Sequence, residues 1–175
     1  MKKYTCCFAG PGPERLPFSM TCRSLRRDFL YERILSAIVE KRKHDHCRTF
    51  LCGMEQGADL LCAQAVLELK EEFCASIRLA CVLTYPGQAE DWPKKAREQY
   101  QSILERADRR IVLQDEETNG CLLAQKRFMI KRSSHLIAVS NGIYGGLPAY
   151  AMDYARKRGL SITVIEPALP SGHIL

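Results

Sequence analysis

Glycine recurs in this chain at the ends of apolar segments, in a pattern that is typical of phosphate binding. Eight of the eleven glycines follow a segment that is expected to be a β-strand: Gly10, Gly12, Gly53, Gly57, Gly87, Gly142, Gly145 and Gly146. Glycine at such a place lets backbone N–H groups approach a ligand closely, and a following helix N-terminus favours an anion. The pattern predicts a site for a phosphate compound along one edge of a sheet.

The first of these junctions reads Gly10-Pro11-Gly12-Pro13 and is followed by Arg15. Its Gly-x-Gly spacing is shared with dinucleotide-binding turns, but the third glycine of that motif is absent and the two prolines lack an N–H. We interpret the segment as a rigid turn that lines a pocket. Arg15 either donates to the ligand or lies in solvent.

The second junction, from Gly53 to Asp59, places Glu55 between Gly53 and Gly57 at a strand-to-helix boundary. A carboxylate there can accept hydrogen bonds from ribose hydroxyls or position a water molecule, so Glu55 is the best candidate for a catalytic residue. Asp59 falls in the first turn of the following helix, where an acidic side chain usually complements the helix dipole.

The third junction, Asn141-Gly142-Ile143-Tyr144-Gly145-Gly146, gives the strongest local signal in the chain. It follows an apolar segment and precedes a helix, so its consecutive N–H groups could form a nest for an anion. The alternative is an ordinary glycine-rich turn with no ligand.

A fourth candidate is the polar loop from Tyr85 to Trp92, which contains the only tryptophan. Its indole could stack on a nucleotide base or could cover the end of the core, and the sequence does not separate these alternatives.

Other groupings of reactive side chains do not form a recognisable site. His44-Asp45-His46-Cys47 follows a basic helix end, where imidazoles suit the dipole, and the adjacent Ser133-Ser134-His135 would point to opposite faces of a strand. The nine cysteines lie mostly in apolar segments and contain no Cys-x-x-Cys pair, so we expect nine reduced thiols. We therefore predict no metal and no cofactor.

Strand-like and helix-like segments alternate along the whole chain. Short apolar runs predict strands at 4–9, 49–52, 77–83, 110–113, 136–139 and 161–165. Helical periodicity predicts helices that begin near 25, at 58–73, from 93 to 107, at 120–133 and at 147–158. We expect an α/β fold: a single Rossmann-like, doubly wound domain over 1–175, with a mostly parallel sheet, helices on both faces and a loose tail at 166–175.

The formal charge of +6 is carried by the first 48 residues, which hold eleven Lys and Arg against five Asp and Glu. This basic first helix could bind nucleic acid, although acidic residues interrupt it. No run is apolar enough to span a membrane, and the N-terminus lacks the features of a cleavable signal, so we expect a cytoplasmic protein. The sequence leaves open whether copies of the chain associate.

Taken together, the glycine junctions resemble the YpsA/YoqJ-type proteins of the SLOG superfamily, Rossmann-like domains related to DNA-processing protein A and the lonely-guy enzymes. The resemblance is carried by the segments 8–17, 53–70, 85–108 and 126–155. It implies a nucleotide-derived ligand. Pro11 and Gly12 stand where the family usually has His and Arg, and Leu147 stands in place of a threonine. Tyr150 replaces the glutamate of the lonely-guy enzymes, so the resemblance gives the hydrolase less support.

Three functions follow as hypotheses. The leading one is a cytoplasmic binding or sensor module for a nucleotide or nucleotide-derived ligand. The second is hydrolysis of the N-glycosidic bond of a nucleoside monophosphate, with Glu55 beside the ribose. The third is binding of single-stranded nucleic acid through the basic first helix. No complete catalytic constellation is visible, which favours a protein that is not an enzyme.

Overall fold

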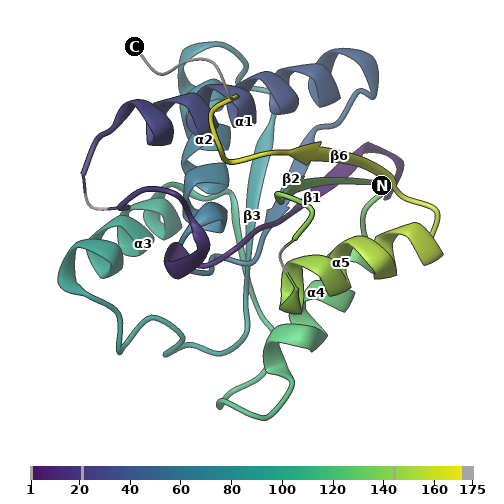
Figure 1. The fold of residues 1–175 in the computed structure, drawn as a ribbon. Helices are drawn as coiled ribbons and strands as arrows, with labels where there is room; N and C mark the ends of the chain where they lie inside the picture. Colours follow the sequence, from purple (N-terminus) through teal and green to yellow (C-terminus); the bar gives the residue numbers. More distant parts are fainter. Residues whose placement is uncertain (1, 21, 144, 171–175) are drawn as a thin grey trace.

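The computed structural model describes residues 2–20, 22–143 and 145–170, in which strands and helices alternate (Figure 1). The strands are β1 (Thr5–Ala9), β2 (Thr49–Cys52), β3 (Arg78–Leu83), β4 (Arg109–Val112), β5 (His135–Val139) and β6 (Ser161–Ile165). The α-helices are α1 (Leu25–His44), α2 (Ala58–Glu72), α3 (Lys94–Arg106), α4 (Cys121–Lys131) and α5 (Gly146–Lys157). Short 3-10 turns lie at Lys2–Tyr4 and Pro13–Arg15.

All pairs of neighbouring strands in the sheet are parallel, and the strand order is β4-β3-β2-β1-β5-β6. The chain builds outward from β1 to one edge, then returns to the other side of β1 with β5. The order therefore reverses between β1 and β5, and the doubly wound α/β prediction is confirmed. In such sheets a crevice forms at the carboxyl ends of the strands beside this reversal.

The two faces of the sheet are covered by different helices (Figure 1). Successive side chains of a strand point to opposite faces, so Cys6 and Phe8 join one core while Cys7 and Ala9 join the other. Helices α1, α2 and α3 pack on the first face, and α4 and α5 pack on the second. The central strands are buried on both sides, which explains their almost wholly apolar sequences.

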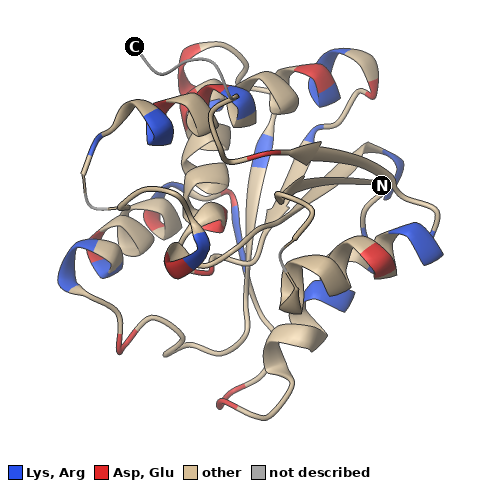
Figure 2. Ribbon diagram, viewed as in Figure 1, with Lys and Arg blue, Asp and Glu red and all other residues tan. Residues whose placement is uncertain are grey.

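Helix α1 begins at a Ser24 cap, whose side chain accepts a hydrogen bond from the N–H of Arg27 at 3.2 Å. Acidic residues are interspersed among its basic ones along the ribbon (Figure 2). Lys41 is nearly buried and forms an ion pair with Asp45 at 3.0 Å. Part of the positive charge of this helix is therefore neutralised by an ion pair within the fold.

The predicted elements are all present, with ends shifted by one or two residues. Strand β1 begins at Thr5 because Lys2–Tyr4 form a 3-10 turn, and β4 covers Arg109–Val112 instead of 110–113. The expected tail is irregular from 166 to 170, and 171–175 lie outside the described residues.

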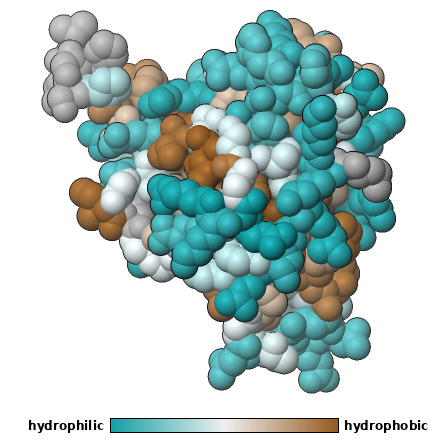
Figure 3. Space-filling view, turned by 90° about the vertical axis from the view of Figure 1, so that its right-hand side faces the viewer, coloured by the Kyte–Doolittle hydropathy of each residue, from teal (hydrophilic) through white to brown (hydrophobic). Residues whose placement is uncertain are grey.

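The edges of the sheet differ in chemistry. Strand β4 carries Arg109 and Arg110, whereas β6 has no charged residue, and its Val164 is half exposed. Figure 3 shows the face toward the right of Figure 1, where apolar side chains gather in small groups among hydrophilic ones. Within the described part of the chain, no helix has the length and hydropathy needed to cross a membrane.

Candidate functional site

A cavity of about 430 Å³ lies at the carboxyl ends of the strands, within the size range of small-ligand sites. It is lined by residues from the junctions after β1, β2, β3, β4 and β5 and from the start of α4. The lining residues are Gly10, Pro11, Gly12, Glu14, Arg15, Glu55, Gln56, Thr84, Tyr85, Gln88, Trp92, Glu117, Cys121, Leu122, Gly146, Leu147 and Pro148. Residues far apart in the sequence thus meet at the point where the strand order reverses.

The turn after β1 is held directly against the start of α2. The N–H of Ala58 donates to the carbonyl oxygen of Pro11 at 3.1 Å. Gly57 has φ +103°, and a Cβ there would lie 2.6 Å from the same Pro11 oxygen. A Cβ on Gly10 would lie 2.4 Å from Cβ of Ala58. Gly10 and Gly57 therefore permit close packing of two junctions.

The junction after β2 holds Glu55 at the cavity through a strained backbone. Met54 is fully buried and has φ +59°, a conformation that residues other than glycine seldom adopt. Gln88 fixes this backbone, because its Nε2 donates to the carbonyl oxygens of Met54 at 3.1 Å and Gly53 at 3.3 Å. The side chain of Met54 points into the core, and that of Glu55 reaches the cavity.

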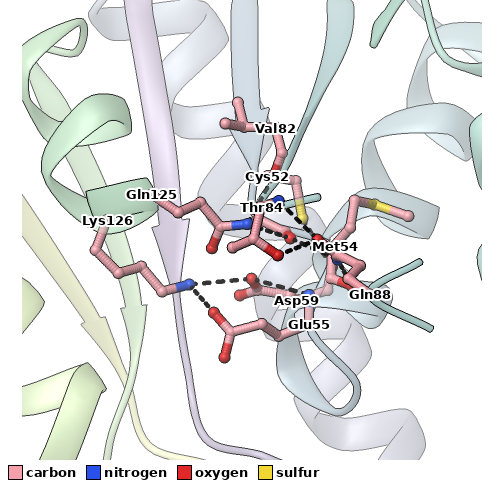
Figure 4. Close-up of polar contacts among 10 residues, drawn as sticks. Cys52, Met54, Glu55, Asp59, Val82, Thr84, Gln88, Gln125 and Lys126 are labelled. Atoms are coloured by element: carbon pink, nitrogen blue, oxygen red, sulfur yellow. Dashed lines mark hydrogen bonds and ion pairs between the residues drawn. The ribbon is translucent and has the colours of Figure 1, made fainter. Parts of the chain in front are cut away.

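Behind Glu55 lies a buried ammonium group (Figure 4). Nζ of Lys126, on α4, is 2.7 Å from Oε1 of Glu55 and 3.2 Å from Oδ2 of Asp59. The side chains of Lys126 and Asp59 are 2% and 1% exposed, whereas that of Glu55 is 27% exposed. The site therefore consists of one accessible carboxylate that is supported from behind by a buried ion pair.

Burial and neighbouring charges shift the pKa values of Asp59 and Lys126. Burial raises the pKa of Asp59 to about 6, even though the Lys126 ammonium acts in the opposite direction. Burial alone would lower the pKa of Lys126, but the carboxylates of Asp59 and Glu55 outweigh it and raise that pKa above its ordinary value. Lys126 is therefore charged at neutral pH and attracts both carboxylates.

The residue beside Lys126 joins α4 to the sheet. Nε2 of Gln125 donates to the carbonyl oxygens of Gly53 at 2.9 Å and Val82 at 2.7 Å, at the ends of β2 and β3. A Cβ on Gly53 would lie 2.6 Å from Oε1 of Gln125. Gly53 therefore provides room for the amide of Gln125, which fixes α4 and with it Lys126.

The junction after β5 reaches the cavity through its last residues. Nη1 of Arg15 donates to the carbonyl oxygen of Gly145 at 3.0 Å, and Gly146, with φ +71°, begins α5. The N–H groups of Gly142 and Ile143 bond instead to side chains of the same loop, at 3.1 and 2.9 Å. These two amides therefore already have acceptors within the loop, whereas Gly146 lies in the cavity lining. The anion nest predicted for the segment from Asn141 to Gly146 stays a prediction.

Aromatic side chains border the cavity on the side of the β3–α3 loop. Trp92 packs edge-on against Tyr100, with ring centroids 5.3 Å apart, and also lines the cavity. It therefore packs against the core and also lines the cavity. Stacking on a base stays a prediction. Tyr85 lines the same wall. The pKa of its phenol is raised, first by desolvation and then by Glu117.

The candidate residues from the sequence divide into two sets. Those that line the cavity are Gly10, Pro11, Gly12, Arg15, Glu55, Tyr85, Trp92 and Gly146. Those that lie outside its lining are Gly53, Gly57, Asn141, Gly142 and Gly145. The members of the second set for which contacts are described support the loops that form the walls.

The buried network of Lys126, Asp59 and Gln125 is not evident from the sequence pattern. Asp59, which was expected to complement a helix dipole, is instead the buried partner of Lys126, and neither Lys126 nor Gln125 was identified. A signal was available: Gln125 and Lys126 lie four residues before the buried Met129 and Ile130, so they share the inward face of α4. Polar side chains on a buried face require partners.

The remaining reactive residues form no second centre. Among the residues that the structure describes, no three His, Cys, Asp or Glu lie close enough to hold a metal ion. None of the nine cysteines is joined in a disulfide in the structure. That all nine are reduced in the native protein stays a prediction. Asp45, from the His-rich segment, pairs with Lys41 and lies 3.7 Å from Nδ1 of His135.

Comparison with known proteins gives relatives over most of the chain. A protein of Bacillus thuringiensis (strain Al Hakam) named "UPF0398 protein" is 30% identical over 129 residues, which cover 73% of this chain and 67% of the relative. A "UPF0398 protein" of Bacillus pumilus is 28% identical over 125 residues, or 70% of this chain. That match spans 64% of the B. pumilus protein, slightly less than two thirds of its length.

A family model agrees with these relatives and with the fold. The model named YpsA, which describes the YspA SLOG family, matches residues 26–167. The matched region includes the junctions after β2, β3 and β5 and the whole of α4, and so contains Glu55, Asp59 and Lys126. The chain belongs to the YspA SLOG family.

Proposed function

We propose that the protein binds a nucleotide or nucleotide-derived ligand in the cavity at the strand-order reversal. The observation that carries this proposal is the convergence of an accessible, ion-paired carboxylate with helix N-termini and an arginine around one cavity. Membership of the SLOG family supports a nucleotide-related ligand. The cytoplasm remains the compartment that we expect for such a module.

The chemistry of the walls fits the parts of a nucleotide. The N–H groups of Gly146 and Leu147, in the first turn of α5, suit a phosphate, and Arg15 adds a positive charge beside them. Glu55 can accept hydrogen bonds from ribose hydroxyls, and Trp92 can stack on a base. Each part of the ligand thus has a wall of matching chemistry.

The charge of the lining favours a ligand with few negative charges. Glu14, Glu55 and Glu117 face the cavity, and Arg15 is the basic residue among the lining residues. Lys126 offsets Glu55 from behind. A monophosphate or a phosphodiester suits this balance better than a triphosphate does.

A thermal-shift panel tests the proposal directly. The panel contains AMP, NAD, ADP-ribose and cyclic dinucleotides, with ribose 5-phosphate and free adenine as partial ligands. A ligand at about one hundred times its Kd adds about 2.7 kcal/mol of stability. A rise in Tm with an intact nucleotide, reduced in Glu55→Gln and Arg15→Ala, supports the proposal. The absence of a shift with every compound contradicts it.

Glycosidic-bond hydrolysis is the second candidate, because Glu55 is exposed to the cavity and held at a fixed place by Lys126. A carboxylate beside the ribose can stabilise positive charge that develops at the anomeric carbon. The test is release of adenine from AMP, with Glu55→Gln as the control. Release that disappears in Glu55→Gln supports hydrolysis, and binding without release supports a sensor or binding module.

A further inference from the structure

Behind the cavity, Lys126 and Asp59 form a second layer of charged residues next to Glu55. What we infer from this layer rests on the proposed function, in which Glu55 faces the ligand. Helix α4, which carries Lys126, and helix α2 lie on opposite faces of the sheet. The side chain of Lys126 is only 2% exposed and reaches Glu55 (Figure 4). A charge at such a place requires partners, and Glu55 and Asp59 supply them. The ammonium group is thus shared between a carboxylate in the cavity and one in the core.

The hydrogen bonds of this layer are incomplete in one respect. Asp59 uses Oδ2 to accept from Lys126 at 3.2 Å and from the N–H of Glu55 at 3.5 Å, but its buried Oδ1 has no partner among the described residues. Oε1 of Gln125, also buried, has none either. Both side chains adjoin Gly53, where a Cβ would lie 2.6 Å from Oε1 of Gln125 and 3.0 Å from Oδ2 of Asp59. The buried layer behind Glu55 therefore contains two acceptor oxygens, one on Asp59 and one on Gln125, that have no donor among the described residues.

We propose that Lys126 is the positioning residue that fixes Glu55 toward the ligand, and that Asp59 is a proton-binding counter-ion that modulates this hold. A proton on Asp59 would neutralise one of the two carboxylates that share the ammonium and would leave the whole charge of Lys126 to Glu55. Loss of that proton makes Glu55 and Asp59 compete for one ammonium and adds a negative charge behind the cavity. Binding of an anionic ligand therefore takes up a proton and weakens as the pH rises.

Among the ionisable groups around it, Asp59 is the one that we expect to titrate near neutral pH. From α4 it faces Lys126, and from its own junction it faces Glu55. The thiols of Cys7, Cys52 and Cys62 also interact with it, from β1, β2 and α2. Burial raises the pKa of each thiol, so they stay neutral, and burial raises the pKa of Asp59 to about 6.

The test compares the wild type with Asp59→Asn and with Asp59→Asn/Lys126→Met. The double variant removes both buried charges together, so no buried ion is left without a partner. Asn at position 59 imitates the protonated acid. The matched control is Lys70→Met/Asp108→Asn, which removes another Lys–Asp pair, 2.8 Å apart, at the opposite end of the sheet.

The ligand-free proteins give the first readout, by NMR of the lysine ammonium groups and of the carboxyl carbons. We expect a solvent-protected Lys126 ammonium in contact with Glu55 in the wild type and in Asp59→Asn. We also expect Asp59 to titrate near pH 6 in the wild type. Absence of the ammonium contact overturns the positioning role, and an Asp59 that is already ionised at pH 4 overturns the proton-binding role.

Calorimetry with ADP-ribose, whose phosphates do not titrate between pH 5 and 8, gives the second readout. We expect wild-type affinity to fall about tenfold across this range and the affinity of Asp59→Asn to stay constant. The double variant should bind at least about tenfold more weakly than Asp59→Asn, and the control should match the wild type. Equal affinity of the double variant and Asp59→Asn overturns the positioning role. No binding by the wild type, with the ammonium contact present, refutes the proposed ligand class alone.

Discussion

Arg15 and Gly145 join the junction after β1 to the junction after β5, both of which contribute residues to the cavity lining. Nη1 of Arg15 donates to the carbonyl oxygen of Gly145 at 3.0 Å, so the turn after β1 is tied to the residue that precedes α5. The two junctions flank the place where the strand order reverses. The guanidinium group is consequently held beside the N-terminus of α5, which is where the proposed function has a phosphate.

Arg15→Ala is expected to weaken ADP-ribose binding by roughly 10- to 100-fold, because a charge-assisted hydrogen bond contributes roughly 1.5–3 kcal/mol. Stability should change by less than about 0.5 kcal/mol, since the contact lies at the surface. Calorimetry and urea unfolding measure the two quantities. Arg156→Ala, which breaks an exposed pair with Asp153 at 2.7 Å, is the control and should bind normally.

Lys126→Met is expected to destabilise the protein by roughly 3–5 kcal/mol, because it leaves the buried Asp59 carboxylate without its cation. Lys70→Met breaks the pair with Asp108, in which the lysine is 21% exposed, and should cost only about 1 kcal/mol. Urea unfolding at neutral pH compares the variants. Similar losses for both would show that the Lys126 pair contributes no more than a partly exposed one.

Asp59→Asn is expected to change how stability depends on pH. The pKa of Asp59 in the fold is about 6, above its ordinary value of 3.8, so the folded protein holds the proton more tightly than the unfolded chain. The stability that this proton contributes is complete below about pH 4 and is lost as the pH rises through 6. Between pH 4 and 7 the free energy of unfolding of the wild type should therefore fall by roughly 3 kcal/mol relative to that of the variant.

Denaturant unfolding of both proteins across this range checks the prediction. Parallel pH profiles would contradict it. A wild type that gains stability over the variant as the pH rises would show that the carboxylate of Asp59, and not its protonated form, is favoured in the fold.

Gly57→Ala is expected to destabilise the protein by roughly 2 kcal/mol or more, because the φ of +103° is strained for alanine and the new Cβ would lie 2.6 Å from the Pro11 oxygen. Gly145→Ala is the matched control: its φ is −80°, and apart from its chain neighbours no described residue has an atom within 4 Å of the added Cβ. The control should stay within about 0.5 kcal/mol of the wild type. Equal melting temperatures for the two variants would contradict the packing role of Gly57.

Cys74 is expected to be the fastest-reacting thiol of the folded protein. Its pKa is lowered, chiefly by a hydrogen bond with Ser76, and its side chain is partly exposed. The buried thiols of Cys6 and Cys62 have raised pKa values and should react only when the chain unfolds. Timed alkylation with mass spectrometry measures this order, with the exposed Cys22 as an internal reference. Faster labelling of a buried thiol would contradict it.

The sequence was sufficient to predict the architecture because the fold depends on local signals. Apolar runs of strand length alternate with helical stripes, and the glycines mark the ends of the strands. The order of the strands was not predicted, because parallel crossovers restrict the topology without selecting one order, and it comes from the structure. Glu55 could be identified because it lies between two such glycines, and its side chain does reach the cavity.

The buried network could not be derived in the same way, because it depends on which helix face meets which junction. Asp59 in a first helical turn is equally compatible with solvent or with a buried partner. Lys126 lies in α4, and only the packed sheet brings its ammonium to within 3.2 Å of that carboxylate. The loop that begins at Asn141 is the opposite case. Its glycine pattern is clear in the sequence, but the N–H of Ile143 donates to the side chain of Asn141 within the loop.

The left-handed backbone of Met54 has a consequence for the thermodynamics of binding. The Met54 side chain is fixed in the core and its carbonyl is fixed by Gln88, so the chain around Glu55 is already ordered in the ligand-free protein. The conformational entropy of this segment is lost when the protein folds, and little remains to be lost when a ligand arrives. Affinity at this site should therefore reflect the fit between the ligand and a preorganised acceptor, more than any adjustment of the loop.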